Sequence, residues 1–295
     1  MKTSAQKTFI FLLSILLVAN LFTLLFFVAT TAKSKSFSID DTITEVFLGD
    51  SHVRYAVNDS LLPLSINLGN SSESVYFSYF KLKHLLKSNH SIESLYLGFS
   101  YHNISDYYDQ YINGQYSLSV APSYFYLLPF TEQVQMIGWN IRRLPSFVKA
   151  ILKSGLKIWR KDNTFKGGFN NPHTNTTANK ATMDERLNSQ YYRNDTLSSF
   201  STLNLRYFDS IVALCKEQQV ELVIVNTPIH SYYQSKIPKE FVDKHNSLTH
   251  SYNLRTIDLT VLELPDTSFQ GEGDLVSMEG AMRATEEIKT NIELE

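Results

Sequence analysis

The sequence predicts an α/β fold in which helices cover both faces of a parallel sheet, the three-layer, flavodoxin-like arrangement. Short apolar runs that end at glycine or asparagine alternate with longer segments of helical periodicity. This alternation occurs twice, once near residue 45 and again after residue 200. Apolar runs that alternate with helices are typical of parallel strands, which are buried on both faces.

The expected elements follow in order along the chain. In the first half we expect a strand over 44–48, a second over 65–68, a helix over 73–87 with its apolar residues on one face, and a strand over 92–97. In the second half we expect a helix over 203–219, a strand over 220–225, a helix over 239–252, a strand over 254–258 and a charged amphipathic helix over 279–293. These elements together form the expected main domain over 44–295.

The N-terminal segment is apolar. No charged residue occurs from Thr8 to Ala32, and about 20 apolar residues suffice to cross a hydrocarbon core of about 30 Å. We therefore expect an uncleaved transmembrane signal anchor over 1–32, with a cytoplasmic N-terminus and the body of the protein outside the cytoplasm. A cleaved signal peptide, ending near the small residues of 29–32, is the alternative. The polar segment 33–43 is expected to be a tether.

The alternation of strands and helices is interrupted between about residues 104 and 200. The stretch 124–159 is aromatic and basic, and we interpret it as a mostly helical insertion packed on the sheet. A helical lid or a membrane-surface element is the alternative, because basic helices with aromatic faces lie well at a headgroup boundary. The run 163–179, rich in Asn, Thr and Gly, is expected to be a loop.

The composition excludes several classes of function. With 27 basic and 29 acidic residues and a net charge of −2, the chain has no single-sign field that would attract nucleic acid. Its single cysteine, Cys215, lies in an apolar helical stretch and is expected in the core. Ligand spacing for a metal and the Gly-rich fingerprint of a nucleotide site are both missing from the sequence, so no cofactor is expected.

One motif points to ester chemistry. Hydrolysis by a serine needs an exposed nucleophile, a base that accepts its proton and donors that meet the developing oxyanion. The motif Gly49-Asp50-Ser51-His52 directly follows the first expected strand, which puts Ser51 at the edge of the sheet where ligands bind. Ser51 is therefore a candidate nucleophile. Gly69, which follows the second strand, is a candidate oxyanion donor because its backbone amide can approach closely.

Glycine turns after three consecutive strands, at Gly49, Gly69 and Gly98, resemble the first three sequence blocks of the SGNH, or GDSL, hydrolase family. The resemblance covers roughly residues 44–100 and 203–290. It implies a serine esterase or O-acyltransferase, with Asp50 as a structural partner of the turn backbone. Similar membrane-tethered proteins act on cell-surface polysaccharide beside membrane-bound acyl-transfer proteins, so the resemblance implies a glycan or such a protein as partner.

The chain departs from the family's pattern at two places. Near residues 271–281 the family has an acidic residue, then a histidine three positions later, then Gly-Ala at the start of the last helix. In that register Glu272 takes the acid position, Gly280 and Ala281 match, and Leu275 takes the place of the histidine base. In the third block Ser100 replaces the asparagine that would donate to the oxyanion.

Several other residues are candidate substitutes for the missing base. His230 follows the strand 220–225 at the same sheet edge, and Asp274 adjoins the vacant position. Glu272 is a further carboxylate candidate. His52 is adjacent to Ser51, but the side chains of successive residues at a strand end diverge. His102 and Asn103, which follow the third strand, are further candidates at that edge.

Two hypotheses follow. In the first, the chain is a degenerate or pseudo-enzyme whose sheet-edge cleft binds a cell-envelope glycan or a partner protein, because leucine cannot accept a proton. In the alternative, Ser51 is the nucleophile of an esterase or O-acyltransferase that acts on acyl esters of surface polysaccharide. A sensor or structural envelope protein is a third class.

Overall fold

The computed structural model describes residues 4–35, 37–159, 167–174 and 176–293. At its centre lies a five-stranded sheet in the order β2-β1-β3-β6-β7. The strands are β1 Glu45–Leu48, β2 Ser65–Asn67, β3 Ser94–Gly98, β6 Glu221–Asn226 and β7 Arg255–Asp258. All four neighbouring pairs are parallel. This is the flavodoxin-like order of doubly wound α/β proteins, so the predicted fold class is confirmed.

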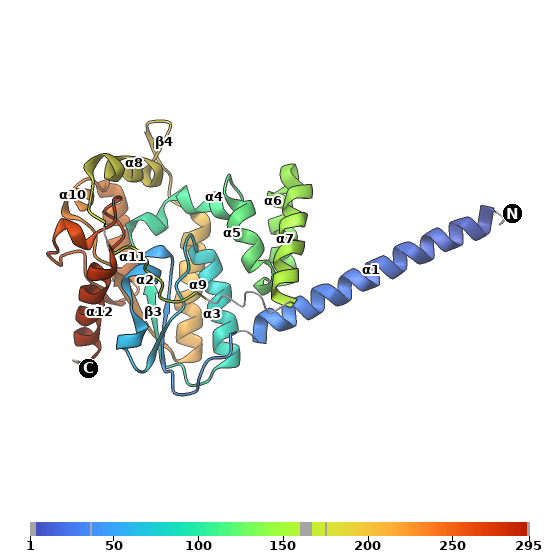
Figure 1. The fold of residues 1–295 in the computed structure, drawn as a ribbon, viewed down its shortest axis with the longest axis horizontal. Coiled ribbons are helices and arrows are strands. Elements are labelled where there is room, and N and C mark those ends of the chain that lie inside the picture. The colour runs from blue at the N-terminus through green and yellow to red at the C-terminus, as the bar shows by residue number, and fades with distance from the viewer. Residues whose placement is uncertain (1–3, 36, 160–166, 175, 294–295) are drawn as a thin grey trace.

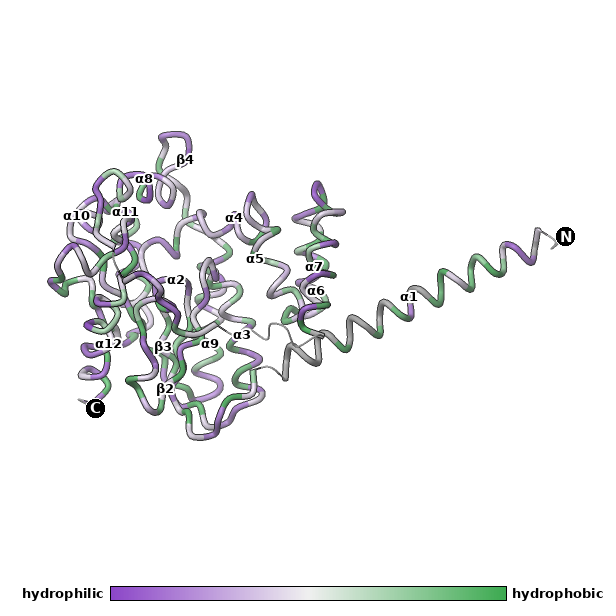
Figure 2. Tube along the Cα trace, viewed as in Figure 1, coloured by the Kyte–Doolittle hydropathy of each residue, from purple (hydrophilic) through white to green (hydrophobic). Residues whose placement is uncertain are grey.

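Helices cover both faces of this sheet (Figure 1). The main ones are α2 Ser51–Ala56, α3 Val75–Ser88, α9 Thr202–Gln218, α11 Lys239–Ser251 and α12 Met278–Glu293. Successive side chains of a strand point to opposite faces of the sheet, so alternate residues pack against the helices on each face. Leu48 and Leu97 pack in one core cluster with α3 and α9, whereas Phe47 and Tyr96 pack in the other with α2 and α12. Hydrophilic and hydrophobic residues alternate along the trace of α12 (Figure 2), as expected of an amphipathic helix.

The segment expected as an insertion is mostly helical. It contains α4 Asp109–Ile112, α5 Ser117–Tyr124, α6 Phe130–Trp139, α7 Leu144–Trp159 and α8 Lys180–Tyr191. Phe125, Phe147 and Ile151 are buried in the α3/α9 cluster, so these helices share the core of the sheet rather than form a separate body. A small hairpin of β4 Tyr192–Arg193 and β5 Thr196–Leu197 was not predicted. Its turn residues have positive φ, which Asn and Asp tolerate.

The structure also contains one short helix and several 3-10 turns. They are α10 Ser231–Gln234 and the 3-10 turns Asp59–Leu61, Tyr101–Ile104, Asp106–Tyr108, η4 Phe125–Leu127, Ile141–Arg143 and Asp266–Ser268. The expected loop over 163–179 has neither helix nor strand at 167–174 and 176–179, and its other residues lie outside the described part. Cys215 is buried as predicted, and burial raises the pKa of its thiol to about 12.

The N-terminal helix α1 runs from Ser4 to Lys35 and extends away from the body (Figure 1). It contacts α7 and η4. The anchor expected over 1–32 falls on α1 and on residues 1–3, which lie outside the described part. Among the described residues, none of the helices combines the length and the hydropathy needed to cross a membrane.

The segment expected as a tether over 33–43 is docked onto the body. Its first residues belong to α1, and Phe37 is buried in the α3/α9 cluster. The Ile39 amide donates to Asn89 Oδ1 at 2.8 Å, and the Asn89 side chain donates back to the Phe37 carbonyl at 2.8 Å. From Phe37 onward the segment is therefore fixed to the body, through the buried Phe37 ring and the hydrogen bonds with Asn89.

Candidate functional site

Ser51 is the first residue of α2, directly after the turn that ends β1. Gly49 has a φ of +146°, a conformation that side chains disfavour, and Asp50 caps the helix by accepting the His52 amide at 2.8 Å. The short helix itself was not predicted. The Ser51 side chain is nearly buried, with the residue 9% exposed.

The three glycine turns pack around one side chain, Val53 of α2. A Cβ at Gly49 would lie 2.9 Å from a Val53 methyl, and one at Gly69 would lie 3.0 Å from the other. A Cβ at Gly98 would overlap Val53 as well. Atoms at such distances would have to move, so these glycines let α2 approach the carboxyl edge of the sheet. Close packing therefore accounts for all three glycine turns, including that of Gly69, the predicted oxyanion donor.

Gly69 and Ser100, the two residues predicted to contact the oxyanion or the substrate, donate their hydrogen bonds to other groups of the protein. The Gly69 amide donates to Asn67 Oδ1 at 2.8 Å within its own turn. The Ser100 hydroxyl donates to Asn226 Oδ1 at 3.2 Å, and its amide donates to Asn103 Oδ1 at 2.7 Å. Because these donors are already engaged in local hydrogen bonds, the structure does not support the roles predicted for Gly69 and Ser100.

Ser51 opens into a cavity of about 190 Å³. Two residues of the degenerate family block, Glu272 and Leu275, line this cavity together with Ser51. The remaining lining is polar and aromatic: Tyr55, Ser71, Ser72, Tyr107, Tyr108, Tyr111 and Arg186. Among the described residues, no hydrogen bond engages the Ser51 hydroxyl. Leu275, which the sequence resemblance assigns to the position of the base, thus lines the same cavity as Ser51.

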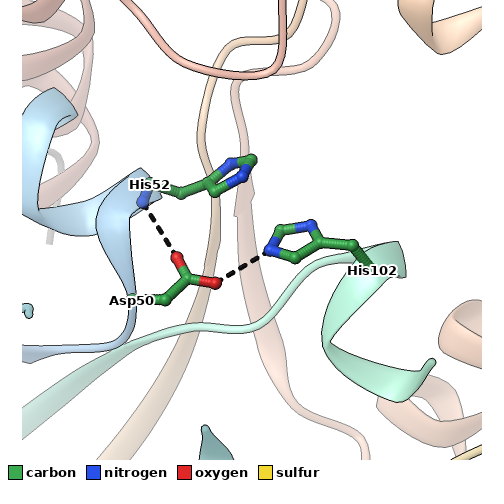
Figure 3. Close-up of side chains that lie close together, drawn as sticks. All are labelled: Asp50, His52 and His102. Atoms are coloured by element: carbon green, nitrogen blue, oxygen red, sulfur yellow. Dashed lines mark hydrogen bonds and ion pairs between the residues drawn. The ribbon is translucent and has the colours of Figure 1, made fainter. Parts of the chain in front are cut away.

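A buried polar cluster lies behind this cavity, centred on Asp50 (Figure 3). Asp50 Oδ2 accepts from His102 Nε2 at 2.8 Å, from the Asn103 amide at 2.9 Å and from the Tyr108 hydroxyl. Burial alone would raise the pKa of Asp50, but His52, His102 and these hydrogen bonds hold it well below its usual range. Burial and the facing His52 lower the pKa of His102, so His102 is a neutral donor to an ionised Asp50.

His52 belongs to the same cluster and turns away from Ser51. Its ring stacks on His102 with centroids 4.1 Å apart and planes at 24°. Its Nδ1 lies 3.3 Å from Thr227 Oγ1, and its Nε2 lies 3.4 Å from Asp274 Oδ2. Both ring nitrogens therefore lie near groups other than the Ser51 hydroxyl, and among the described residues no hydrogen bond joins His52 to Ser51.

Asp274 is buried and ion-paired. Its Oδ2 accepts from Arg186 Nε at 2.7 Å and from the Gln190 amide at 3.0 Å. Burial would raise its pKa, but Arg186 and His52 together hold the pKa of Asp274 well below the usual range. A carboxylate with a lowered pKa is a weaker proton acceptor, and the structure therefore does not support Asp274 as the substitute base.

His230 lies away from the Ser51 cavity, whose lining does not include it. Its Nε2 lies 3.0 Å from Asp266 Oδ1. Its Nδ1 accepts the Tyr232 amide at 3.1 Å and so caps α10. Both ring nitrogens are used in this loop, and the predicted role of His230 as a base is not supported.

Asp50, His52 and His102 lie close enough together to be considered as metal ligands. One ligand atom from each residue lies within 4.8 Å of the other two. The two imidazoles are stacked, which directs their in-plane lone pairs side by side rather than toward a common point. The Asp50 oxygens already accept four hydrogen bonds, including that of the His52 amide. The three residues therefore fit a hydrogen-bonded network better than a metal centre.

The insertion contributes to this site, which the sequence pattern did not predict. Tyr107, Tyr108 and Tyr111 line the cavity from the segment that the family resemblance does not cover. Their clustering in the sequence was a signal that could have been used, because aromatic residues with hydroxyl groups are common in binding sites. Arg186 gave no such signal, since only the tertiary fold brings α8 to Asp274.

The chain matches no protein-family model, and no curated protein matches it either. Solved structures similar to it include a protein provisionally assigned as a platelet activating factor from Streptococcus pneumonia, with 13% identity over 95% of this chain and 98% of that one and a TM-score of 0.44. A provisionally assigned acylhydrolase from Bacteroides fragilis has 10% identity over 84% and 86% of the two chains and a TM-score of 0.38. A GDSL-like lipase from Bacteroides thetaiotaomicron has 9% identity over 86% and 90% and a TM-score of 0.40.

One of these names, that of the GDSL-like lipase, is the name of the family that the sequence resembles. Because the identities are only 9–13% and the TM-scores lie below 0.5, the function of this chain has to be inferred from its own side chains.

Proposed function

We propose that this protein is a binding protein on a hydrolase-like scaffold, whose Ser51 cavity holds a carbohydrate without turning over an ester at the rate of a serine hydrolase. The observation that carries the proposal is Leu275, an aliphatic side chain that lines the cavity beside the Ser51 hydroxyl. Without a base, a serine retains only the residual rate that comes from binding and oxyanion contacts.

The lining of the cavity supports a carbohydrate ligand. Tyrosine rings offer apolar faces to a sugar ring, and their hydroxyls, with those of serine, offer partners for its hydroxyls. At about 190 Å³ the cavity is smaller than most small-molecule sites, which measure about 300–1,000 Å³. It therefore suits a small group, such as a single sugar unit or its acyl substituent. A glycan of the cell envelope is the proposed source of that unit.

The alternative is a serine esterase or O-acyltransferase that acts on acyl esters of surface polysaccharide. One observation favours it: Glu272 lines the same cavity as Ser51, so its carboxylate could take the proton of the hydroxyl. In this alternative a membrane-bound acyl-transfer protein would supply the acyl group. The placement of the body outside the cytoplasm, on an anchor over 1–32, stays a prediction from the sequence.

A variant with a histidine at position 275 distinguishes the binding-protein proposal from the esterase alternative. We expect Leu275→His to raise hydrolysis of p-nitrophenyl acetate about a hundredfold or more, because a positioned imidazole contributes about 10²–10⁴ to such rates. Reaction of Ser51 with a fluorophosphonate probe, followed by mass spectrometry, should rise in parallel. Leu275→His combined with Ser51→Ala is the matched control and should remain at the background rate.

The rate at which the wild-type protein hydrolyses the ester decides between the binding-protein proposal and the esterase alternative. A wild-type protein that hydrolyses the ester as fast as Leu275→His, with loss of activity in Ser51→Ala, would overturn the binding-protein proposal. In that case Glu272→Gln should abolish the activity, as the alternative requires.

A further inference from the structure

Basic residues are concentrated in one stretch of the insertion. No acidic residue occurs between Glu132 and Asp162, whereas seven basic residues do, in a chain whose net charge is −2. They are Arg142, Arg143, Lys149, Lys153, Lys157, Arg160 and Lys161. This stretch contains η5 Ile141–Arg143 and α7. The function proposed for the Ser51 cavity does not use it.

The buried face of α7 fixes how this helix is oriented. Phe147, Ile151 and Ile158 are buried in the α3/α9 cluster. A Cβ at Gly155 would overlap the hydroxyl of Tyr126, which donates to the Ile151 carbonyl at 3.0 Å. Because this face is closely packed, the opposite face of α7 is turned outward in one defined orientation.

The outward face of α7 carries lysines and leucines together. Lys149, Lys153 and Lys157 recur every four residues and are exposed, so they form one row along the helix. Leu152 and Leu156 adjoin this row and are 43% and 50% exposed. Among the described residues, none is an ion-pair partner of these three lysines. Their charges are therefore available to a partner outside the chain.

Exposed apolar side chains are concentrated in the same region. Outside α1, twelve large apolar side chains of the described residues are exposed, and five of them lie between residues 130 and 156. They are Phe130, Val134, Ile141, Leu152 and Leu156. The helices α6 and α7, which carry four of the five, lie at one side of the body (Figure 1). Exposed apolar residues that gather in one region indicate an interaction surface, whereas single scattered ones do not.

This region adjoins a second apolar surface, that of α1. The helix α1 contacts α7 and extends from the side of the body at which α6 and α7 lie (Figure 1). Its apolar side chains are exposed, among them Phe11, Leu17 and Leu24, at 58–68%. The outward face of α7 is therefore next to a helix whose own apolar residues have no cover within the described chain.

We infer that α7 lies along an anionic lipid surface, with its leucines among the upper acyl chains and its lysines at the headgroups. Helices that lie in the plane of a membrane surface combine an apolar side with a polar side rich in lysine. Lysine stems cover apolar surface while their ammonium groups stay in water.

Anionic lipid is the occupant for two reasons. The row of lysines complements negatively charged headgroups, and the adjoining helix α1 is the one on which the predicted anchor falls. The inference does not depend on the ligand proposed at Ser51. A contact through α7 in addition to α1 would hold the body in one orientation on the membrane surface.

A fluorescent label on the full chain tests the inference. Leu152→Cys is labelled with an environment-sensitive nitrobenzoxadiazole group, and the native Cys215 is buried, so the wild type checks that only position 152 reacts. The vesicles contain phosphatidylglycerol and phosphatidylcholine in equal parts, or phosphatidylcholine alone. With the mixed vesicles we expect the emission to shift to shorter wavelength and to be quenched by lipids with brominated acyl chains. Both effects should shrink with phosphatidylcholine alone and at high salt concentration.

A label at position 261 is the matched control for the site. Val261 is 75% exposed and lies after β7, outside the basic stretch. The label on Val261→Cys should keep the emission of a water-exposed group with both kinds of vesicle.

Removal of the lysine row tests the role of charge. Each lysine near an anionic surface contributes about fivefold to binding, so Lys149→Gln/Lys153→Gln/Lys157→Gln should lower the ratio of lipid-bound to free label about tenfold or more. The same number of charges is removed by Lys236→Gln/Lys239→Gln/Lys244→Gln, at and just before α11 on the far side of the body (Figure 1). In this control the ratio should stay within about twofold, because the effect of a charge falls off within a Debye length.

Three results would overturn the inference: a label at position 152 that responds no more than one at position 261, equal responses of the two triple lysine variants, or an equal response with phosphatidylcholine alone. A shift that appears without lipid as the protein concentration rises would identify a second copy of the chain as the occupant, and would overturn it too. None of these measurements involves Ser51, so their failure leaves the proposed function standing.

Discussion

Two buried polar networks of this protein differ in where their hydrogen bonds lead. Behind Ser51, the network of Asp50, His102 and His52 closes on itself and on Asp274. Among the described residues, no hydrogen bond joins either imidazole to the Ser51 hydroxyl.

The second network runs through the loop after β2. It begins at the buried ion pair of Glu73 and Lys81. The Tyr124 hydroxyl donates to Glu73 Oε2 at 2.7 Å, the Asn70 amide donates to Tyr124 at 2.7 Å, and Arg54 Nη1 donates to Asn70 Oδ1 at 3.4 Å. The first network stabilises the turn after β1, whereas the second links the loop after β2 to the insertion.

The largest expected effect concerns the second network. Lys81→Met leaves the Glu73 carboxylate buried without its cation, and we expect the free energy of unfolding to fall by about 3–5 kcal/mol. Urea denaturation followed by circular dichroism measures this loss. The double variant Glu73→Gln/Lys81→Met should recover most of it, because no unpaired charge remains. A double variant as unstable as the single one would show that packing, rather than charge, sets the cost.

The next effect concerns the first network and its response to acid. The folded pKa of Asp50 lies below the unfolded value of about 3.9, so the unfolded state binds more protons in acid. The stability that Asp50 contributes is therefore fully present above about pH 4 and is lost as the pH falls below that value. The lowered pKa of His102 also makes the protein less stable as the pH falls, and this loss of stability begins below about pH 6.5.

We expect Asp50→Asn to lose roughly 2–3 kcal/mol at pH 7, the scale of hydrogen bonds to a buried charge. Denaturation curves from pH 7 to pH 3 should then converge, since the variant lacks the carboxylate that titrates. Parallel curves for the wild type and the variant would contradict this account of the first network.

The smallest effect is expected at a histidine outside both networks. His230 pairs with Asp266, whose side chain is 72% exposed, and exposed pairs contribute about 0–1 kcal/mol. His230→Gln should therefore change the unfolding free energy by less than about 1 kcal/mol and leave ligand binding at Ser51 unaffected. A large loss of binding in this variant would place His230 in the site after all and would weaken the contrast between the two networks.

Strand and helix positions in the sheet were predictable because each depends on a local pattern. The buried runs at β1, β3 and β6 are apolar on both faces, and α3 and α9 repeat their apolar residues with helical spacing. The docking of the segment after α1 was missed because its apolar residues Phe37, Ile39 and Ile43 are too few to form a periodic pattern.

The candidate site was predictable only in part. Ser51 follows from its place after the first strand, and the presence of Leu275 beside it follows from the family's motif. The direction of a hydrogen bond cannot be read from spacing, and for that reason the roles assigned to Gly69, Ser100 and His230 were not supported.

The sequence by itself determined the order of elements, the serine at the edge of the sheet and the leucine at position 275, since each is a matter of residue type and local pattern. Only the tertiary structure decided which polar groups serve one another and which line the Ser51 cavity. The partners of Asp50 and Arg54 come from separate parts of the chain. Their contacts depend on close packing of side chains, which no local pattern encodes.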